Sequence, residues 1–356
     1  MLENKNIFIK KKILIYGLGK SGFSSYKFLK NKNTLNIFDD NKILNQNSDI
    51  KKKLIKYNDI RNKDFDYIIL SPGININNCL LKKYLFRNLK KIRTDLDIFY
   101  SLYNKNKNIT ITGTNGKSTT VQILYEILKK QKFDVRLVGN IGNPILLEKK
   151  ITKNTLFVIE ASSYQLEYSK FFKSNFGAIL NITPDHLERH KTLKKYLEAK
   201  FKLIENQTSK DFAFLNIQDL HIKKTLKKKN IHSKVIKVNP KIDLKFLKKI
   251  NNRYFLTDGN KENLAFVIEI LKKFNINKKI FIKTLKKFHG LKYRQQIIYK
   301  SKKFTIINDS KATSFSSSIS LLKSLSNVYW IVGGLAKKGD KFFLSKNNCK
   351  TFKVYI

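Results

Sequence analysis

The residues best suited to chemistry in this chain form a glycine-rich segment, Gly113-Thr-Asn-Gly116-Lys117-Ser118. A short apolar run comes just before this segment, and a helical pattern from about 120 to 130 follows it. In such a turn, backbone N–H groups can surround phosphate oxygens, and the helix N-terminus adds its positive end. We expect Lys117 to reach the β- and γ-phosphates of a nucleotide and the Ser118 hydroxyl to bind Mg²⁺. The common P-loop has a glycine six residues before its lysine, where this chain has Ile111, so the loop is a variant form.

Phosphoryl transfer also needs metal ligands, and two candidates follow predicted strands. Glu160 comes after the apolar run 156–159, and His186 comes shortly after the run 177–180. Because the carboxyl ends of parallel strands meet at one edge of a sheet, both side chains should face the phosphate loop. Carboxylate and water suit Mg²⁺, whereas imidazole is an unusual ligand for it. Taken singly, a solvated glutamate and a core or capping histidine remain open alternatives.

A third polar segment, Asn308-Asp309-Ser310-Lys311, follows the run 304–307, which reads as a buried strand. An aspartate beside a lysine at a strand end can orient ribose hydroxyls and neutralise phosphate charge. The alternative is an aspartate that caps a helix beside an exposed lysine.

A second glycine motif, Gly17-x-Gly19-x-x-Gly22, lies between the run 13–16 and a helical pattern that extends through Leu29. The next run, 35–38, ends at Asp39. This order of strand, glycine turn, helix and strand with a terminal acid fits the dinucleotide fingerprint. By itself the motif is compatible with NAD, with another nucleotide, or with a tight turn that only packs a helix on a strand.

These elements must be positioned by a larger scaffold, and the chain of 356 residues is long enough for two or three domains. We predict three α/β units, over residues 1–100, 101–290 and 291–356. Each contains apolar runs that end in polar clusters, as ligand-bearing strands do in open α/β sheets. The last unit is shorter than a free-standing α/β domain usually is.

Composition narrows the possible classes of protein. The chain has 73 Lys and Arg against 26 Asp and Glu, a formal net charge of +47, and a hydrophobic content of 42%. That apolar content argues against global disorder. No apolar run approaches the ~20 residues of a membrane span. The two cysteines, Cys79 and Cys349, give neither a disulfide framework nor a metal motif, which fits a reducing cytoplasm. The lysines are interpreted mainly as a solvated surface, with a polyanion site as the alternative.

Taken together, these segments resemble the Mur ligase family. The loop from Thr112 to Thr119 is the form that the family has, which accounts for the absence of the earlier glycine. The segments 160–167, 181–190 and 196–200 resemble those that follow it in the family. The segment 308–313 is the most discriminating, because it resembles the branch that adds D-glutamate to UDP-N-acetylmuramoyl-L-alanine. The resemblance covers nearly the whole chain in order.

The resemblance implies an α/β fold of three domains. A Rossmann-like domain at 1–100 would bind the UDP substrate, and a P-loop ATPase-like domain at 101–290 would bind ATP. An incomplete Rossmann-like domain at 291–356 would bind the amino acid and nucleotide. The implied reaction is ATP-dependent amide formation through an acyl phosphate, with Mg²⁺, in peptidoglycan precursor synthesis. The implied protein is a cytoplasmic monomer without a specific nucleic-acid partner or membrane insertion.

The resemblance also implies roles for individual residues. The catalytic set would be Lys117, Glu160, His186, Lys200 and Lys311. ATP would be bound by Gly113, Thr114, Asn115, Gly116, Lys117, Ser118, Thr119, Asn260, Asn263, Arg294 and Asp309. The UDP substrate would be bound by Gly17, Gly19, Ser21, Gly22, Asp39, Ser71, Asn140, Ser162 and Gln165. D-Glutamate would be bound by Lys311, Thr313 and Lys337. Metal would be held by Ser118, Glu160, His186 and Lys200, the last as a carbamate.

Several departures from the family pattern affect these expectations. Gly259 precedes Asn260 where the family has histidine, and Leu291-Lys-Tyr-Arg294 replaces Leu-Pro-His-Arg. Lys337 is chosen by position, with Lys338 as the alternative. No segment resembles the second half of the family's third domain. A fragment, a truncated gene product and a reduced enzyme are the alternatives, and we predict little ligase activity from this chain by itself.

Three competing functions remain open from the sequence. The first is another amide-forming ligase of the same family, against which the segment 308–313 argues. The second is an NAD-dependent oxidoreductase that uses the glycines at 17–22, which leaves the phosphate loop without a role. The third is a nucleic-acid-binding protein driven by charge, which should bind DNA or RNA in a strongly salt-dependent way.

Overall fold

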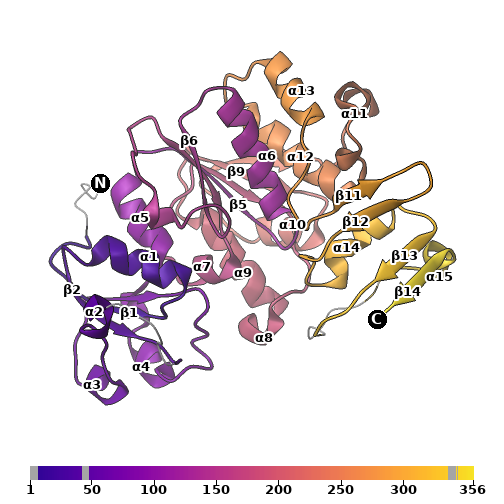
Figure 1. Cartoon of the computed structure of the whole chain (residues 1–356). Coiled ribbons are helices and arrows are strands. Elements are labelled where there is room, and N and C mark those ends of the chain that lie inside the picture. Colours follow the sequence, from indigo (N-terminus) through magenta and orange to yellow (C-terminus); the bar gives the residue numbers. More distant parts are fainter. Residues whose placement is uncertain (1–6, 42–47, 336–341, 343) are drawn as a thin grey trace.

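The computed structural model describes residues 7–41, 48–335, 342 and 344–356. Helices alternate with strands along most of the chain, and the strands form separate sheets that follow one another in the sequence (Figure 1). The predicted α/β class is therefore correct. The boundaries at residues 100 and 290 stay predictions, and the two large sheets span 12–93 and 108–238.

The first sheet has four parallel strands in the order β2-β1-β3-β4. Its strands are β1 (Lys12–Tyr16), β2 (Thr34–Phe38), β3 (Tyr67–Leu70) and β4 (Ile92–Arg93). Its helices are α1 (Lys20–Leu29), α2 (Ser48–Lys51), α3 (Tyr57–Arg61), α4 (Lys82–Arg87) and the 3₁₀ turn η1 (Leu89–Lys91). The apolar run at 13–16 is fully buried, as a central parallel strand covered on both faces must be.

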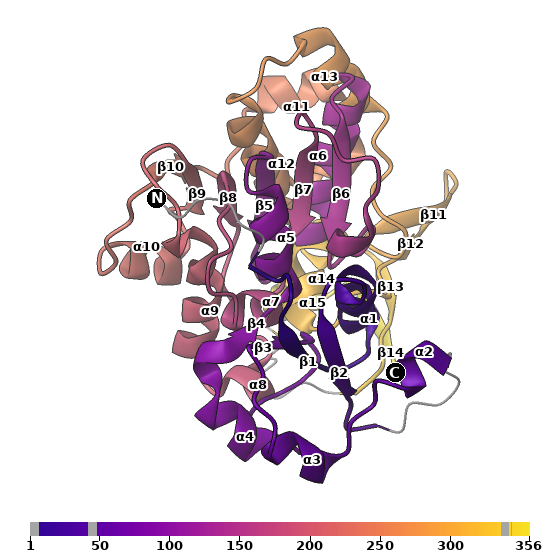
Figure 2. The same ribbon diagram turned by 90° about the vertical axis from the view of Figure 1, so that its left-hand side faces the viewer.

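Helix α5 (Asp95–Tyr103) connects the first sheet to the second. At its N-terminus, Oδ2 of Asp97 accepts the backbone N–H of Thr94 at 3.1 Å, which satisfies one of the free donors of the first turn. The helix packs against α1 on one side and α7 on the other, so it lies between the two sheets (Figure 2).

The second sheet has six parallel strands in the order β10-β9-β8-β5-β7-β6. Its strands are β5 (Asn108–Thr112), β6 (Val135–Gly139), β7 (Leu156–Glu160), β8 (Phe176–Ile179), β9 (Phe212–Asn216) and β10 (Lys234–Val238). Its helices are α6 (Lys117–Lys130), α7 (Ser163–Glu167), α8 (Leu187–His190), α9 (Leu193–Glu205), α10 (Leu220–Leu226), α11 (Leu244–Ile250), α12 (Asp258–Leu271) and α13 (Lys278–Lys286). Two 3₁₀ turns are η2 (Ile145–Leu147) and η3 (Arg253–Leu256).

Two apolar layers cover the faces of this sheet. Ile109 and Ile111 of β5 join one layer, which includes residues of α6 and α12. Phe157 and Ile159 of β7 join the other layer, which includes Phe201 of α9 and residues of the first sheet. Alternate residues of one strand point to opposite faces, so a strand buried on both sides carries a continuous apolar run. Because β5 lies between β8 and β7, the segments that follow these strands meet at one sheet edge.

The last part of the chain contains two small sheets. β11 (Gln296–Lys300) and β12 (Thr305–Asn308) form an antiparallel hairpin, and β13 (Val328–Ile331) pairs in parallel with β14 (Phe352–Tyr355). Helices α14 (Phe315–Leu322) and α15 (Lys346–Cys349) complete this part. The expectation of a buried strand at 304–307 is wrong, since Phe304 and Ile306 are 54% and 44% exposed. An apolar run predicts a strand but not its coverage, and in the described residues β12 pairs only with β11.

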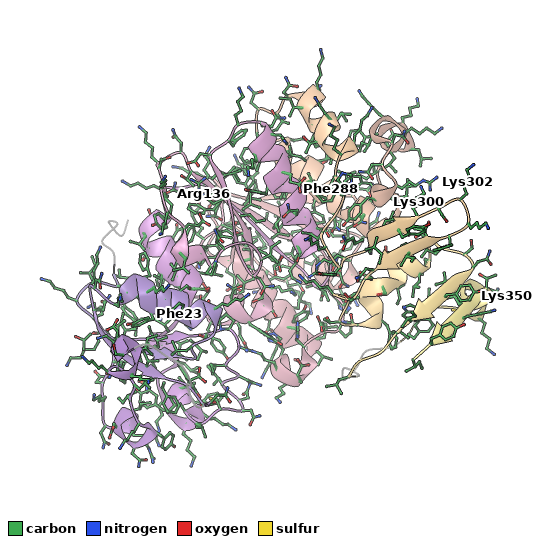
Figure 3. All side chains as sticks on the ribbon, viewed as in Figure 1. Phe23, Arg136, Phe288, Lys300, Lys302 and Lys350 are labelled. Atoms are coloured by element: carbon green, nitrogen blue, oxygen red, sulfur yellow. The ribbon has the colours of Figure 1, made fainter. Side chains whose placement is uncertain are left out.

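Lysine side chains extend outward over much of the surface. Lys300 and Lys302 on the β11–β12 hairpin and Lys350 near the C-terminus point away from the ribbon (Figure 3). Long cationic side chains in this arrangement form a solvated face. No helix in the described residues combines the length and apolar character that crossing a bilayer would require.

Candidate active site

A cavity of about 940 Å³ lies where the strands of the second sheet end. Its lining includes residues that follow β5, β6 and β8, the last residue of β7, residues of α12, and residues of the segment that follows β12. The predicted site residues in this lining are Thr114, Asn115, Gly116, Lys117, Ser118, Thr119, Asn140, Glu160, His186, Asn260, Asn263, Arg294, Asp309, Lys311 and Thr313. One cavity therefore collects residues that are far apart in the chain.

The phosphate loop is shaped by two glycines and by the segment after β8. Gly116 has φ +84°, and a Cβ there would lie 2.0 Å from Oδ1 of Asn263. The backbone N–H of Asn115 donates to Oδ1 of Asn181 at 2.8 Å, and Thr114 N–H donates to the Asn181 carbonyl at 2.9 Å. Only a residue without a side chain fits at position 116, so the loop conformation depends on glycine there.

Helix α6 begins at Lys117, directly after Gly116. Ser118 is therefore in the first turn, where backbone N–H groups lack intrahelical acceptors and the helix dipole is positive. Nζ of Lys117 donates to the carbonyls of Gly113 at 2.8 Å and Thr114 at 2.7 Å. These features are what a phosphate-binding loop requires.

Glu160 is the last residue of β7 and is buried. Its Oε1 accepts a hydrogen bond from Nδ2 of Asn140 at 2.7 Å, whereas its Oε2 has no hydrogen-bond partner in the described part of the protein. A buried carboxylate oxygen without a partner is costly unless a cation meets it. Glu160 and the Ser118 hydroxyl line the same cavity, and this donor set fits a hard divalent cation such as Mg²⁺.

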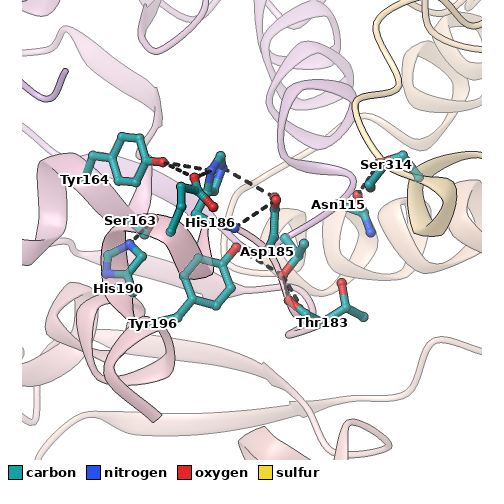
Figure 4. A network of polar contacts seen from close by, with 12 residues as sticks. Asn115, Ser163, Tyr164, Thr183, Asp185, His186, His190, Tyr196 and Ser314 are labelled. Atoms are coloured by element: carbon teal, nitrogen blue, oxygen red, sulfur yellow. Dashed lines mark hydrogen bonds and ion pairs between the residues drawn. The ribbon is translucent and has the colours of Figure 1, made fainter. Parts of the chain in front are cut away.

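His186 has a left-handed backbone, with φ 54°, at the start of α8. Its Nδ1 lies 2.8 Å from the hydroxyl of Tyr164, and its Nε2 lies 3.3 Å from Oδ2 of Asp185 (Figure 4). The side chain is 34% exposed. A metal at His186 would need one ring nitrogen to exchange its present contact, so its fit to a metal is weaker than that of Glu160.

Lys200 on α9 is 1% exposed, and its Nζ donates to the carbonyl of Gly113 at 2.7 Å. The ammonium also lies 4.4 Å from the ring centre of Tyr196. Burial and then the charge of Lys117 hold the pKa of Lys200 well below its usual value. A lowered pKa favours the neutral amine, which is the form that can react with CO₂.

The described residues contain no cluster of three or more His, Cys, Asp or Glu side chains arranged for a metal. The predicted metal set is of a different kind, because it includes a serine hydroxyl and a lysine that would have to be modified.

The far end of the cavity is formed by α12 and the start of the last part of the chain. Nδ2 of Asn260 donates to the Tyr254 carbonyl at 2.8 Å and to Oε1 of Gln295 at 3.1 Å. Asp309 accepts hydrogen bonds from Gln295 N–H at 3.0 Å and from the Ser318 hydroxyl at 2.9 Å. Burial raises the pKa of Asp309, against the opposing effect of these hydrogen bonds. Lys337 and its alternative Lys338 lie outside the described residues.

Most residues predicted to bind the UDP substrate form a second group outside the cavity lining. Gly17 has φ +90°, and its carbonyl accepts the Ser71 hydroxyl at 2.6 Å. A Cβ at Gly22 would lie 1.8 Å from that same carbonyl, so the loop requires glycine at 22. Oδ2 of Asp39 accepts the backbone N–H of Leu18 at 2.6 Å. This group also includes Gly19, Ser21, Ser162 and Gln165.

Some residues in the site have no role in the sequence prediction. Asn181 and Asp185 follow β8, so the rule that ligands gather at strand ends applies to them as well. Glu262 of α12 accepts hydrogen bonds from Asn181 at 2.9 Å and Asn216 at 3.3 Å. Burial raises the pKa of Glu262. No local pattern distinguishes this glutamate from a surface glutamate on the same helix.

Comparison with known proteins identifies close relatives of the chain. The sequence profile of the Mur ligase middle domain matches residues 111–281. The chain is 35% identical to the UDP-N-acetylmuramoylalanine–D-glutamate ligase of Rickettsia prowazekii (strain Madrid E), over 94% of this chain and 79% of that protein.

Solved structures give the same assignment at the level of the fold. The UDP-N-acetylmuramate–alanine ligase MurC of Thermotoga maritima aligns with a TM-score of 0.51 at 18% identity, over 90% of this chain and 80% of that chain. The MurF ligase of Thermotoga maritima, solved in complex with ADP, aligns with a TM-score of 0.51 at 13% identity, over 92% of this chain and 75% of that chain.

Proposed function

Because the chain belongs to the Mur ligase family, we propose that it joins D-glutamate to UDP-N-acetylmuramoyl-L-alanine at the expense of ATP. The proposed setting is peptidoglycan precursor synthesis in the cytoplasm. The relative from Rickettsia prowazekii carries this activity in its name and matches nearly the whole chain. The proposal includes ATP and Mg²⁺ as the nucleotide and the metal.

The observation that carries the proposal is the composition of a single cavity. The phosphate loop at Gly113–Ser118, the carboxylate of Glu160 and the segment with Asp309 and Lys311 all line it. A ligase of this kind must bring a nucleotide, a carboxylate and an amine together in one volume. An oxidoreductase that uses the glycines at 17–22 gives no role to this cavity.

In the first step, the alanine carboxylate of the UDP substrate attacks the γ-phosphorus of ATP and ADP leaves. Two anions must approach each other, so positive charge in the loop lowers the barrier. Lys117 and the first turn of α6 supply that charge. Glu160 and Ser118 would hold Mg²⁺, which when bound neutralises phosphate charge.

Lys200 and His186 are the proposed holders of a second metal. As an ammonium, Lys200 would repel a metal, whereas a carbamate at its Nζ is an anion with two oxygen ligands. Its lowered pKa supports this modification, because the neutral amine attacks CO₂ and then loses a proton. The hydroxyl of Tyr164 would orient the His186 ring through Nδ1.

In the second step, the amine of D-glutamate attacks the carbonyl carbon of the acyl phosphate. The C–O bond breaks, and inorganic phosphate leaves with the proton that the nitrogen loses. Lys311 and Thr313 line the cavity and would bind the carboxylates of the incoming amino acid. Arg294 and Asp309 would contact the nucleotide, with Asn260 and Asn263 near its base. Lys337 remains part of the proposed D-glutamate set.

The test is product formation with a panel of amino acids. The protein is incubated with ATP, Mg²⁺ and UDP-N-acetylmuramoyl-L-alanine, together with D-glutamate, L-glutamate, L-lysine or meso-diaminopimelate. We expect phosphate release and an amide product, identified by mass spectrometry, with D-glutamate alone. The choice of amino acid rather than the absolute rate decides the result. A product only with another amino acid would indicate a different amide ligase of the family.

A loop variant provides the matched control for this assay. Lys117→Ala removes the cation that should reach the phosphates, so it should abolish phosphate release while the UDP substrate still binds. If wild-type protein and Lys117→Ala release phosphate at the same rate, the signal does not come from this loop and the proposal fails.

A further inference from the structure

A buried carboxylate, Asp95, lies between the first sheet and the second. It is the first residue of α5, is 6% exposed, and forms no ion pair in the described part of the chain. Burial without a cation raises the pKa of its carboxyl group. Such a residue is costly for the fold unless its hydrogen bonds offset the lost hydration.

Two side chains from distant parts of the sequence donate to Asp95. The hydroxyl of Ser21, on α1 beside the first glycine loop, donates to Oδ2. Nε2 of Gln165, on α7, lies 3.2 Å from Oδ2 and 3.4 Å from Oδ1. The backbone N–H of Leu96 donates to Oδ1 at 3.0 Å. Every contact to this carboxylate is therefore a donor, which suits a group that only accepts.

The opposite end of Gln165 is also occupied. Its Oε1 accepts the backbone N–H and the hydroxyl of Ser162, each at 3.2 Å, in a capping box at the start of α7. Ser162 lies two residues after Glu160, the carboxylate that fits a metal. A continuous chain of hydrogen bonds thus runs from Ser21 through Asp95 and Gln165 to Ser162, two residues after the end of β7.

A neighbouring aspartate, Asp97, connects helix α5 to the segment that follows α7. Oδ1 of Asp97 accepts the Ser169 hydroxyl at 2.9 Å and the backbone N–H groups of Lys170, Phe171 and Phe172 at 3.0–3.2 Å. The position of Asp95 is therefore fixed relative to α7, and through Ser21 it can fix the first glycine loop.

We propose that Asp95 is a positioning residue for the UDP substrate, through which Ser21 and Gln165 set the first glycine loop relative to the strand end at Glu160. The inference rests on the proposed function, since it presumes a UDP substrate that spans both sheets. The hydroxyl proton of Ser21 is donated to Asp95. Gln165 contacts Asp95 through Nε2 and Ser162 through Oε1. The protein thus holds both side chains in place, and Asp95 acts on the substrate through the geometry it gives them.

The chemistry of this contact suggests an exchange of groups as the test. Asp95→Asn replaces one acceptor oxygen by an NH₂ group, which then faces donors from Ser21 and Gln165. Gln165→Glu places a second carboxylate next to that of Asp95, so that two acceptors face each other. In the double variant Asp95→Asn with Gln165→Glu, one amide again faces one carboxylate, and the new carboxylate at position 165 can still accept from Ser162. Residues in one network are expected to be non-additive in this way.

The measurement is direct binding of UDP-N-acetylmuramoyl-L-alanine and, separately, of ATP, by calorimetry. We expect each single variant to weaken binding of the UDP substrate by about tenfold, while ATP binding changes by less than about threefold. The double variant should recover most of the loss. Asp59→Asn, at an exposed aspartate on α3, is the surface control and should bind both ligands as the wild type does.

Three results would overturn the inference: normal binding of the UDP substrate by Asp95→Asn, equal loss of UDP-substrate and ATP affinity, or a double variant no better than the worse single variant. If the single variants do not fold, the double variant alone decides, because it should fold and bind. Failure of the proposed function appears differently: the wild-type protein itself would not bind the UDP substrate.

Discussion

Lys200 and Lys117 both donate to the main-chain carbonyl of Gly113, at 2.7 and 2.8 Å. Two ammonium groups therefore converge on one oxygen at the start of the phosphate loop, and Lys200 is buried beneath it. Two like charges that share one acceptor oxygen repel each other, and burial also removes water from the Lys200 ammonium, which disfavours its charged form. The arrangement is unfavourable while both lysines are charged, and neutralising or inverting the charge of Lys200 would relieve it.

The first prediction concerns modification of Lys200. In ¹³C-labelled bicarbonate, the wild-type protein should give a carbamate signal by NMR, and Lys200→Met should lack it. Because the pKa of Lys200 is lowered, the neutral amine is present at lower pH than for an exposed lysine, and the signal should fade as the pH falls. Ligase activity of Lys200→Met should fall by about a hundredfold or more.

Lys194→Met, on the exposed face of the same helix, is the control and should keep both the signal and the activity. The thermal midpoint of Lys200→Met should be equal to or above that of the unmodified wild type, since a buried charge is removed. A full carbamate signal in Lys200→Met would contradict the assignment.

The second prediction concerns Gly116 in the phosphate loop. Gly116→Ala puts a Cβ 2.0 Å from Oδ1 of Asn263 and requires φ near +84° in alanine. We expect destabilisation by about 1–3 kcal/mol and at least tenfold weaker nucleotide binding, measured by thermal unfolding and calorimetry. Gly73→Ala is the matched control, because no atom lies within 4 Å of its added Cβ. Equal effects of the two substitutions would argue against a special loop geometry.

The third prediction concerns the unpaired oxygen of Glu160. Glu160→Gln keeps an acceptor for Asn140 but removes the negative charge. Added Mg²⁺ should raise the thermal midpoint of the wild type, since a ligand that binds the folded state stabilises it, and should leave that of the variant unchanged. Ligase activity should fall by about a hundredfold, with little change in the Mg²⁺-free midpoint. A variant that responds to Mg²⁺ as the wild type does would rule out this carboxylate as a ligand.

The fourth prediction concerns acid sensitivity at His190. Burial lowers the pKa of His190 from 6.5 to about 4, and its Nε2 lies 3.0 Å from the Ser163 hydroxyl. The unfolded chain binds the proton first, so the free energy of unfolding should fall as the pH drops from about 6.5 to about 4. The loss should be on the order of 2–3 kcal/mol.

Urea unfolding at several pH values measures this slope. His190→Gln should flatten it, whereas His221→Gln, at an exposed position on α10, should leave it as in the wild type. An unchanged slope in His190→Gln would assign the acid sensitivity to other groups.

Local patterns predict the chemistry-bearing segments well, because their spacing reflects local geometry. The glycine loops lie between strand and helix as expected, and Glu160 is at the strand end. The predicted and observed boundaries of elements differ by a few residues. Helix α6 begins at Lys117 rather than near 120, because the glycine loop leads directly into the helix. The strand at 304–307 is exposed where its apolar run predicts burial, since coverage depends on neighbours that such a run does not specify.

The amino-acid sequence alone is enough to indicate the family, the glycine loop between β5 and α6 and the strand ends at which polar residues gather. Each of these features depends on residues close together in the chain, because hydrophobic periodicity and the backbone conformation of glycine are local properties. The burial of Lys200 against Gly113 and the link from Ser21 through Asp95 to Gln165 emerge only in the folded molecule. These contacts join residues separated by 70 positions or more. Their hydrogen bonds exist only because sheet order and helix packing bring distant segments together, and no local pattern encodes that path.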